Sequence, residues 1–271
     1  MSILPSHLFA QQEAPEDKSE GKAIQKANRN RHYKLKIVGI FAEVPKSFVH
    51  QRLQANAITG CGQYVHPLTA SLIDSVPLIV SQMGPEPFYD AMAETPDFNV
   101  LVGGRAYDPS PYIAFAAHAT KTPLTDTSTP EAKRLWGGFT HMGKILECGG
   151  FCATPKCGAV RATMYQDGTF DLTPGDPESR CTPLSVSAHT LYEKSRPDLL
   201  YGPGGWLDLS KSRYEQLNDG RTCRVSGGSF TFSRDVGLKY QIKLEAARIS
   251  GYRSNYMGSI KDRKLPSVER K

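Results

Sequence analysis

Short apolar runs that end in glycine or proline turns and lead into helical patterns constrain the fold of this chain most. The clearest run, Phe98 to Val102, ends at Gly103-Gly104, and a helical pattern follows from about Asp108 to Ala119. The run Leu35 to Phe41 is also nearly continuous in apolar residues, as in a strand covered on both faces. Strand, turn and helix in repetition predict an α/β fold, here a mostly parallel sheet with flanking helices in the first half.

The second half of the chain has a different pattern. Two strand-like runs, 160–165 and 169–172, flank Asp167-Gly168, a dipeptide typical of tight hairpin turns. One helix is expected over 183–195, and short strand-like runs continue to about Ile249. We therefore expect a mixed α+β second half with antiparallel strands.

The two chain ends differ from the middle in composition. Residues 10–31 are polar, charged and almost free of large apolar groups, so this stretch cannot bury enough surface to offset its ordering entropy. We expect a disordered polar tail at 1–32, one domain at 33–260 and a basic tail at 261–271. The domain is expected to divide into an α/β part at 33–157 and a mixed, β-rich part at 158–260.

Charge and hydropathy exclude two classes of partner. The net charge of +6 lies mostly in the tails, and the middle has no basic stripe interleaved with aromatic residues. No nucleic-acid partner is therefore expected. The chain also lacks an apolar run of about 18 residues and a basic, then apolar, signal peptide at its start. We expect no membrane partner and a cytoplasmic protein whose thiols stay reduced.

The segment GGRAYDPS is the first candidate site, because it follows an expected strand and opens a helix. Ligands of α/β sheets bind beyond the carboxyl ends of strands, and glycines allow a close approach of the backbone. Arg105 could hold a carboxylate or phosphate by two parallel hydrogen bonds. The alternative is structural: Asp108 or Ser110 caps the helix and Arg105 is a surface charge.

The segment HMGKILECGG is the second candidate site, at the end of an expected helix. At 100° per residue, His141, Lys144 and Cys148 share one face, and Glu147 lies between this face and the apolar one. Such a face suits either a ligand crevice or solvent. The spacing of the cysteines at 148, 152 and 157 is unlike that of zinc ligands, so no metal ligand is assigned.

Arg180 marks a third candidate, because it precedes a helix N-terminus where anions are favoured. Thr182 as the cap and Pro183 as the first helical residue also explain this segment as a well-capped structural helix.

These motifs together carry a family resemblance. The segments GGRAYDPS, HMGKILECGG, RCTPLSVSAHTLYEKSRPD and KLEAARISGYRS resemble the acyclic terpene utilisation family named after AtuA, and its fungal members especially. The resemblance runs from about Tyr33 to Ile260. Arg105, Asp108 and Ser110 match the family's GR-x-x-DPS motif, and the residues at 147–149 match its ECG motif.

The chain also departs from the family pattern. Bacterial members have His at the position of Lys144 and a glycine-rich turn where this chain has Glu178-Ser179-Arg180. Family members have an α/β segment before the matched region and a further strand and helix after it. On this comparison we expect a member shortened at both ends, that is, a shortened paralogue or a misassembled gene model.

The resemblance implies a metabolic enzyme, because the namesake belongs to a bacterial pathway that degrades citronellol and geraniol through CoA thioesters. The expected substrate is a small carboxylic acid or acyl-CoA, and the expected chemistry is of the lyase or hydratase type, with no cofactor except CoA as part of the substrate. The expected catalytic residues are His141, Glu147 and Asp108. The expected substrate-binding residues are Arg105, Ser110, Lys144 and Arg180.

Two other functions remain open from the sequence. The first is a truncated, non-catalytic paralogue or interaction subunit. The second is a metal-dependent hydrolase or lyase that uses His141 with carboxylates. A homo-oligomer is compatible with each of the three.

Overall fold

The first-half sheet of the computed structural model has three strands and contains one parallel pair. The structure describes residues 11–13, 34–123 and 128–258. The sheet has the order β1-β2-β4, with β2 and β4 parallel and β1 antiparallel to β2. The three strands are β1 (Gln11–Glu13), β2 (Ile37–Ile40) and β4 (Val100–Gly103). The carboxyl ends of β2 and β4 meet, because Ile40 pairs with Gly103.

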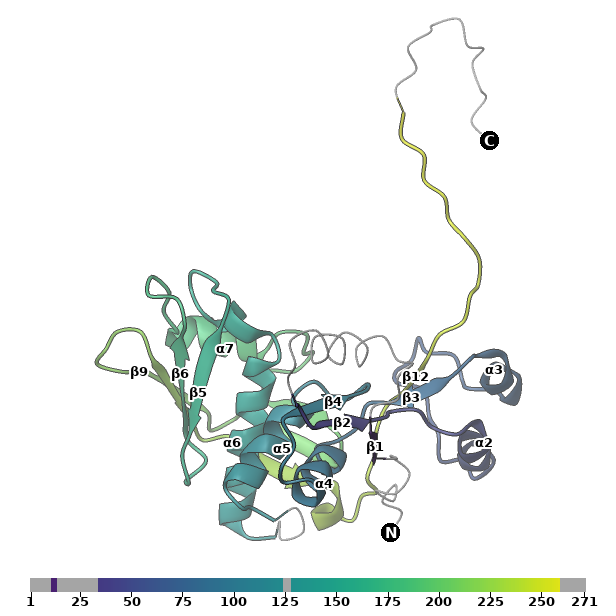
Figure 1. Cartoon of the computed structure of the whole chain (residues 1–271), viewed down its shortest axis with the longest axis horizontal. Helices are drawn as coiled ribbons and strands as arrows, with labels where there is room; N and C mark the ends of the chain where they lie inside the picture. Colours follow the sequence, from purple (N-terminus) through teal and green to yellow (C-terminus); the bar gives the residue numbers. More distant parts are fainter. Residues whose placement is uncertain (1–10, 14–33, 124–127, 259–271) are drawn as a thin grey trace, which may run out of the picture.

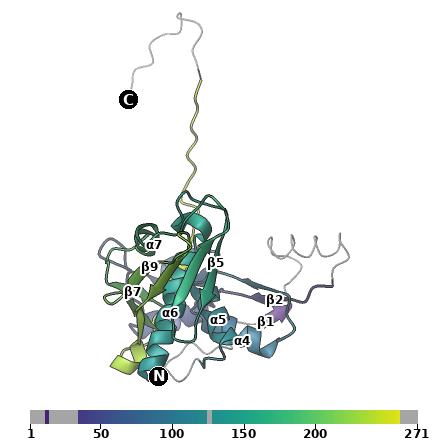
Figure 2. The ribbon, with the colours of Figure 1, turned by 90° about the vertical axis from the view of Figure 1, so that its left-hand side faces the viewer.

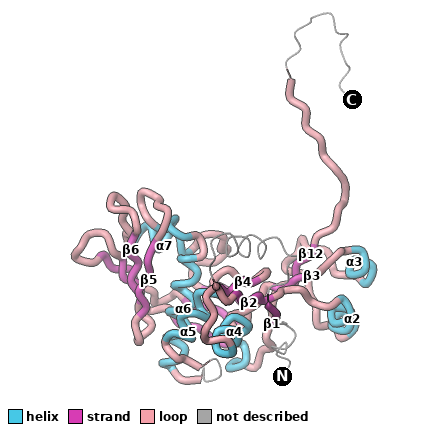
Figure 3. The backbone as a smooth tube through the Cα atoms, viewed as in Figure 1, coloured by secondary structure: helices cyan, strands magenta, loops and turns pink. Residues whose placement is uncertain are grey.

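A second small sheet joins distant parts of the sequence. Strand β3 (Ile79–Ser81) pairs antiparallel with β12 (Leu244–Ala246). Figure 1 shows this pair beside α2 and α3. The helices of this part are α2 (Lys46–Gln54), α3 (Ala70–Ser75) and α4 (Glu86–Glu94). The chain after β12 has neither helix nor strand up to residue 258 and extends away from the rest of the molecule (Figure 3).

Helix α6 (Pro130–Leu146) is the central element of the structure. It packs on α5 (Ser110–Ala119) and on strands of the second half (Figure 1). Thr129 begins the helix by accepting a hydrogen bond from the Ala132 amide, which satisfies one of the free N–H groups of the first turn. A short 3-10 helix, η2 (Gly149–Cys152), follows. Most residues of α6 are buried, including polar ones.

The second half consists of two antiparallel sheets and one α-helix. The four-stranded sheet has the order β5-β6-β10-β9 and is seen from its outer side in Figure 2, and the three-stranded sheet has the order β11-β8-β7. Their strands are β5 (Val160–Met164), β6 (Phe170–Pro174), β7 (Leu199–Gly202), β8 (Gly205–Asp208), β9 (Arg213–Gln216), β10 (Cys223–Ser226) and β11 (Ser229–Phe232). Helix α7 (Pro183–Thr190) precedes β7, and the 3-10 helix η3 (Ser233–Val236) follows β11.

The largest core cluster lies where α6 meets these sheets. It includes Trp136 and Phe139 of α6, Phe170 and Leu172 of β6, and Leu207 of β8, all of them buried. At about 25 cal/mol per Å² of apolar surface, burying side chains of this size contributes roughly 1.5–3 kcal/mol each. The position of α6, and of the polar residues on it, is therefore fixed by the packing of its apolar residues.

The mixed α/β class and the antiparallel second half are confirmed, whereas the expected mostly parallel first-half sheet is confirmed only in part, because its described strands form a single parallel pair. Among the described residues, β2 and β4 are the only strands that pair in parallel. Strand β3 pairs instead with β12, and a single parallel bridge, Met83 to Ala106, links its end to the loop after β4. The apolar runs marked the strands correctly, but an apolar run does not specify which strand lies beside it.

Two other sequence predictions can be compared with the structure. The helix expected over 183–195 ends at Thr190, and Glu193 adopts a positive φ of 59° that an α-helix does not allow. Most of the tail expected at 1–32 and all of the tail at 261–271 lie outside the described residues, although Gln11–Glu13 form β1.

Candidate functional site

Arg105 lies in the loop between β4 and α5, and two carboxylates hold its side chain from two sides. Its Nη1 donates to Asp108 Oδ1 at 2.9 Å and its Nε donates to Glu245 Oε2 at 3.0 Å. Glu245 lies on β12 and also accepts a hydrogen bond from Gln82. The Arg105 side chain keeps 37% exposure. Arg105 is thus a partly exposed cation at the end of β4, oriented by two carboxylates.

The residues at the start of α5 differ in their environments. Ser110 is fully buried, and its hydroxyl donates to the Met83 carbonyl oxygen at 3.0 Å. The N-cap residue is Pro109, and no side chain caps the helix. Asp108, whose side chain is 55% exposed, therefore orients Arg105 and does not act as a cap. The hydrogen bond of Ser110 links the start of α5 to the segment after β3.

Helix α6 brings the second motif against this loop. A methyl group added at Gly143 would lie 2.9 Å from the Pro109 carbonyl oxygen, so only a glycine allows the two backbones to approach so closely. The contact places the residues that follow Gly143 beside the GRAYDPS segment. The first and second candidate segments are neighbours in the fold.

A buried ion pair lies one residue beyond this contact. Lys144 Nζ donates to Glu147 Oε1, with the two side chains 2% and 7% exposed. Burial raises the pKa of Glu147, an effect that the bond to Lys144 partly offsets and the nearby Asp108 charge reinforces. Removing two charges from water is costly, and such a pair is weak evidence for stability. Perturbed carboxyl groups of this kind concentrate at functional sites.

Two residues that the sequence analysis did not assign belong to the same cluster. The Tyr107 hydroxyl is buried and has no hydrogen-bond partner in the described part of the chain. Lys194, just after α7, places its Nζ 5.5 Å from the centre of the Tyr107 ring. The charges of Lys144, Glu147 and Asp108 all act on Lys194. The position of Tyr107 between Arg105 and Asp108 in the motif could have identified it from the sequence. No feature of the sequence marks Lys194.

His141 lies in the core and not in this cluster. Its Nε2 is 3.2 Å from the Thr190 hydroxyl and 3.2 Å from the Tyr214 hydroxyl, and its ring makes an edge contact with Phe170. The side chain is 1% exposed, and burial lowers its pKa to about 3. The imidazole is therefore neutral over the ordinary pH range.

Arg180 contacts a different part of the chain. Its side chain is exposed, and its backbone exchanges two hydrogen bonds with Thr154, at 2.8 and 3.0 Å. The adjacent Cys181 is buried and hydrogen-bonds Cys152. All six cysteines are free thiols. None of these contacts joins Arg180 to the Lys144 cluster.

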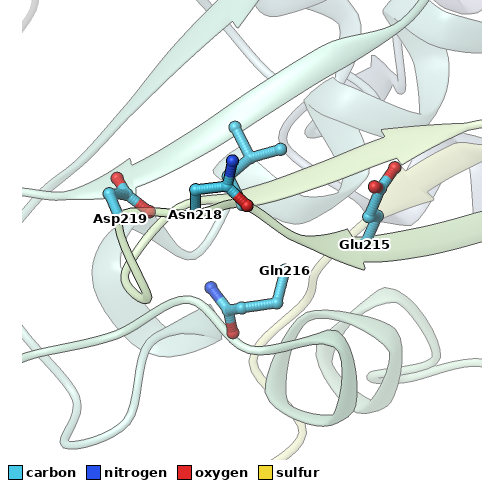
Figure 4. A pocket seen from close by; sticks show the side chains of 5 residues that line it. Glu215, Gln216, Asn218 and Asp219 are labelled. Carbon is cyan, nitrogen blue, oxygen red and sulfur yellow. The ribbon is translucent and has the colours of Figure 1, made fainter.

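A hollow of about 400 Å³ occurs at the turn between β9 and β10, outside the cluster (Figure 4). It is lined by Glu215, Gln216, Leu217, Asn218 and Asp219. Figure 4 shows these side chains spread along the hairpin and not converging on one point. Asp219 is used by the turn itself, because it accepts bonds from the Arg221 and Thr222 amides at 2.9 and 2.8 Å. The hollow therefore supports no catalytic assignment.

The described residues form neither a metal-binding group nor a helix that could span a membrane. No group of three or more His, Cys, Asp and Glu side chains in this part of the chain is arranged to hold a metal ion. None of its helices combines the length and the apolar character that crossing a bilayer requires.

The fold and the cluster define a mixed α/β protein in which a buried lysine–glutamate pair follows the contact between α6 and the loop that carries Arg105. Comparison with protein-family models gives a match to the acyclic terpene utilisation family protein AtuA over residues 16–267. The chain belongs to this AtuA family. The comparisons with curated proteins and with solved structures gave no match.

Proposed function

We propose that the chain is an enzyme that acts on a small carboxylic acid or acyl-CoA by acid/base chemistry of the lyase or hydratase type. The observation that carries the proposal is the Lys144–Glu147 pair, buried to 2% and 7% exposure beside the loop that carries Arg105. The family description, terpene utilisation, supports a metabolic role. CoA enters only as part of the substrate.

Glu147 is the proposed proton-transfer group. A carboxylate whose pKa is raised by burial is a stronger base than one in water, because its pKa lies closer to neutral pH. In this proposal it removes or returns a proton next to the carbonyl group of the substrate. Lys144, hydrogen-bonded to it, stabilises the negative charge that develops on the carbonyl oxygen.

Arg105 is the proposed contact for the anionic group of the substrate. Its guanidinium is oriented by Asp108 and Glu245, and a substrate carboxylate would replace one of these partners. His141, Ser110 and Arg180 receive no catalytic role here, because their contacts lie in the core, at the Met83 carbonyl and at Thr154.

Proton exchange in D2O tests the function without the complete reaction. The full chain is incubated with short carboxylic acids and acyl-CoA thioesters, and deuterium at the carbon next to the carbonyl is measured by NMR. General acid/base catalysis contributes about 10²- to 10⁴-fold, so Glu147→Gln should reduce exchange by at least about 100-fold. The exposed Glu178→Gln variant is the control. Absence of exchange with every compound would favour the non-catalytic alternative, and equal exchange in the wild type and Glu147→Gln would reject the role of Glu147.

A further inference from the structure

Lys194 occupies an unusual position for a lysine. It follows α7 in the chain, is partly buried, and lies over the ring of Tyr107. Four charged side chains act on it: Lys144 and Glu147 of α6, Asp108 before α5, and Lys243 before β12. The cluster thus holds two lysines whose charges influence each other, one of them already paired with a carboxylate.

The surroundings of Lys194 favour its neutral amine. Burial lowers the pKa of Lys194 most, and the positive charges of Lys144 and Lys243 lower it further, whereas Glu147 and Asp108 act in the opposite direction. A lysine in an apolar setting beside a second cation is a common arrangement for a nucleophilic amine. Lys144 is unsuited to this role, because its amine already donates a hydrogen bond to the Glu147 carboxylate.

Tyr107 supplies an unused proton donor at the same place. Its hydroxyl is buried without a partner among the described residues, although buried polar groups are nearly always hydrogen-bonded. Burial raises the pKa of Tyr107, so the phenol keeps its proton. The Tyr107 amide donates to Met83 O at 3.0 Å, and its ring packs on Gly202, which fixes the direction of the hydroxyl. An oxygen atom of a ligand would satisfy this donor.

We propose that Lys194 is a nucleophile that forms a Schiff base with an aldehyde or ketone, and that Tyr107 is the proton donor for this step. The amine nitrogen attacks the carbonyl carbon, the electron pair of the C=O bond moves to oxygen, and this oxygen takes the Tyr107 proton and becomes a hydroxyl group. The nitrogen loses one of its protons to Glu147. Glu147 passes this proton to the hydroxyl group, which leaves as water while the C=N bond forms. The nitrogen keeps its other proton, so the product is a protonated imine, and Tyr107 regains a proton from water. The step releases one water molecule and needs no oxidant.

The Schiff base rests on the proposed acid/base function, because both use Glu147. A protonated imine withdraws electrons from the adjacent carbon and would make a proton there easier for Glu147 to remove. The substrate class then narrows to carbonyl compounds, including those that carry a carboxylate for Arg105.

Reductive trapping tests the inference. The full chain is incubated at neutral pH with pyruvate or acetaldehyde and cyanoborohydride, which reduces an imine to a stable amine. Digestion and mass spectrometry give the rate of modification at each lysine. Lys156 is the matched reference, because it is exposed and also lies over an aromatic ring, with Nζ 4.6 Å from the centre of Phe151. Lys194 should be trapped at least about tenfold faster than Lys156, because burial and the nearby lysine charges lower the pKa of Lys194.

Two variants separate catalysis from simple amine reactivity. Tyr107→Phe keeps the ring and removes a hydroxyl that has no partner, so it should fold and slow trapping at Lys194 alone. Lys156→Met should leave trapping at Lys194 unchanged. Trapping at Lys194 no faster than at Lys156, or an unchanged rate in Tyr107→Phe, would overturn the inference. If deuterium exchange occurs but trapping at Lys194 fails, only the Schiff base is rejected. If trapping at Lys194 occurs but deuterium exchange does not, the acid/base role of Glu147 is rejected.

Discussion

A neutral histidine in the core should make the stability of this protein depend on pH. The pKa of His141 falls from 6.5 to about 3 because the side chain is buried, while the unfolded chain keeps the ordinary value. The unfolded state therefore binds a proton below pH 6.5 that the folded state does not, and stability is lost as the pH falls from 6.5 towards 3. Each pH unit in this window costs about 1.4 kcal/mol, which comes to roughly 3 kcal/mol at pH 4.5.

His141→Gln removes the titration and keeps a polar group near Thr190 and Tyr214. Urea unfolding of both proteins at pH 7.5 and 4.5 gives the change in unfolding free energy with pH. Carboxylates also titrate over this range, so the quantity to compare is the difference between the two proteins. The wild type should lose roughly 3 kcal/mol more than the variant.

A matched control uses an exposed histidine. His66→Gln lies in the loop before α3 and should keep the wild-type dependence on pH. Equal losses in the wild type and His141→Gln would refute the reasoning, because they would mean that His141 titrates alike in the folded and unfolded states.

Two substitutions test the packing and capping that position the cluster. Gly138→Ala would place a methyl group against the Gly168 carbonyl oxygen and should cost roughly 1–3 kcal/mol of unfolding free energy. This cost should exceed the roughly 1 kcal/mol by which alanine is favoured over glycine in a helix. Gly158→Ala, whose methyl group would meet no atom, is its control, and equal stability of the two variants would contradict the packing argument. Thr182→Ala removes the bond that Thr182 accepts from the Ser185 amide at 3.1 Å and should cost about 1 kcal/mol in thermal unfolding, whereas Ser187→Ala in the same helix should cost less.

The sequence predicted most of the local structure around the cluster. The turn after β4 and the start of α5 follow from an apolar run and a glycine pair. Arg105 was recognisable because it directly follows this turn. These features depend on neighbouring residues, and the sequence pattern reports such features well.

The burial of His141 and Lys144 could not be predicted in the same way. Their spacing correctly places them on one face of α6, and this face was expected to meet solvent or a crevice. The last residue of α7 and the turn after it cover this face instead: Thr190 is bonded to His141, and the ring of Tyr192 lies against Lys144. An amphipathic pattern shows which residues share a face of a helix, but not which element packs on that face.

The contact between Arg105 and Glu245 spans 140 residues of sequence, and it sets an order for assembly. Both partners must have left the ribosome before this contact can form. The β2–β4 pair and α6 can associate earlier, because all of their residues precede β12 in the chain. Since contacts of such long sequence separation form slowly, Arg105 should be among the last residues to reach its final position during folding. A growing chain would thus pack α6 against the second-half sheets before Arg105 reaches its partner on β12.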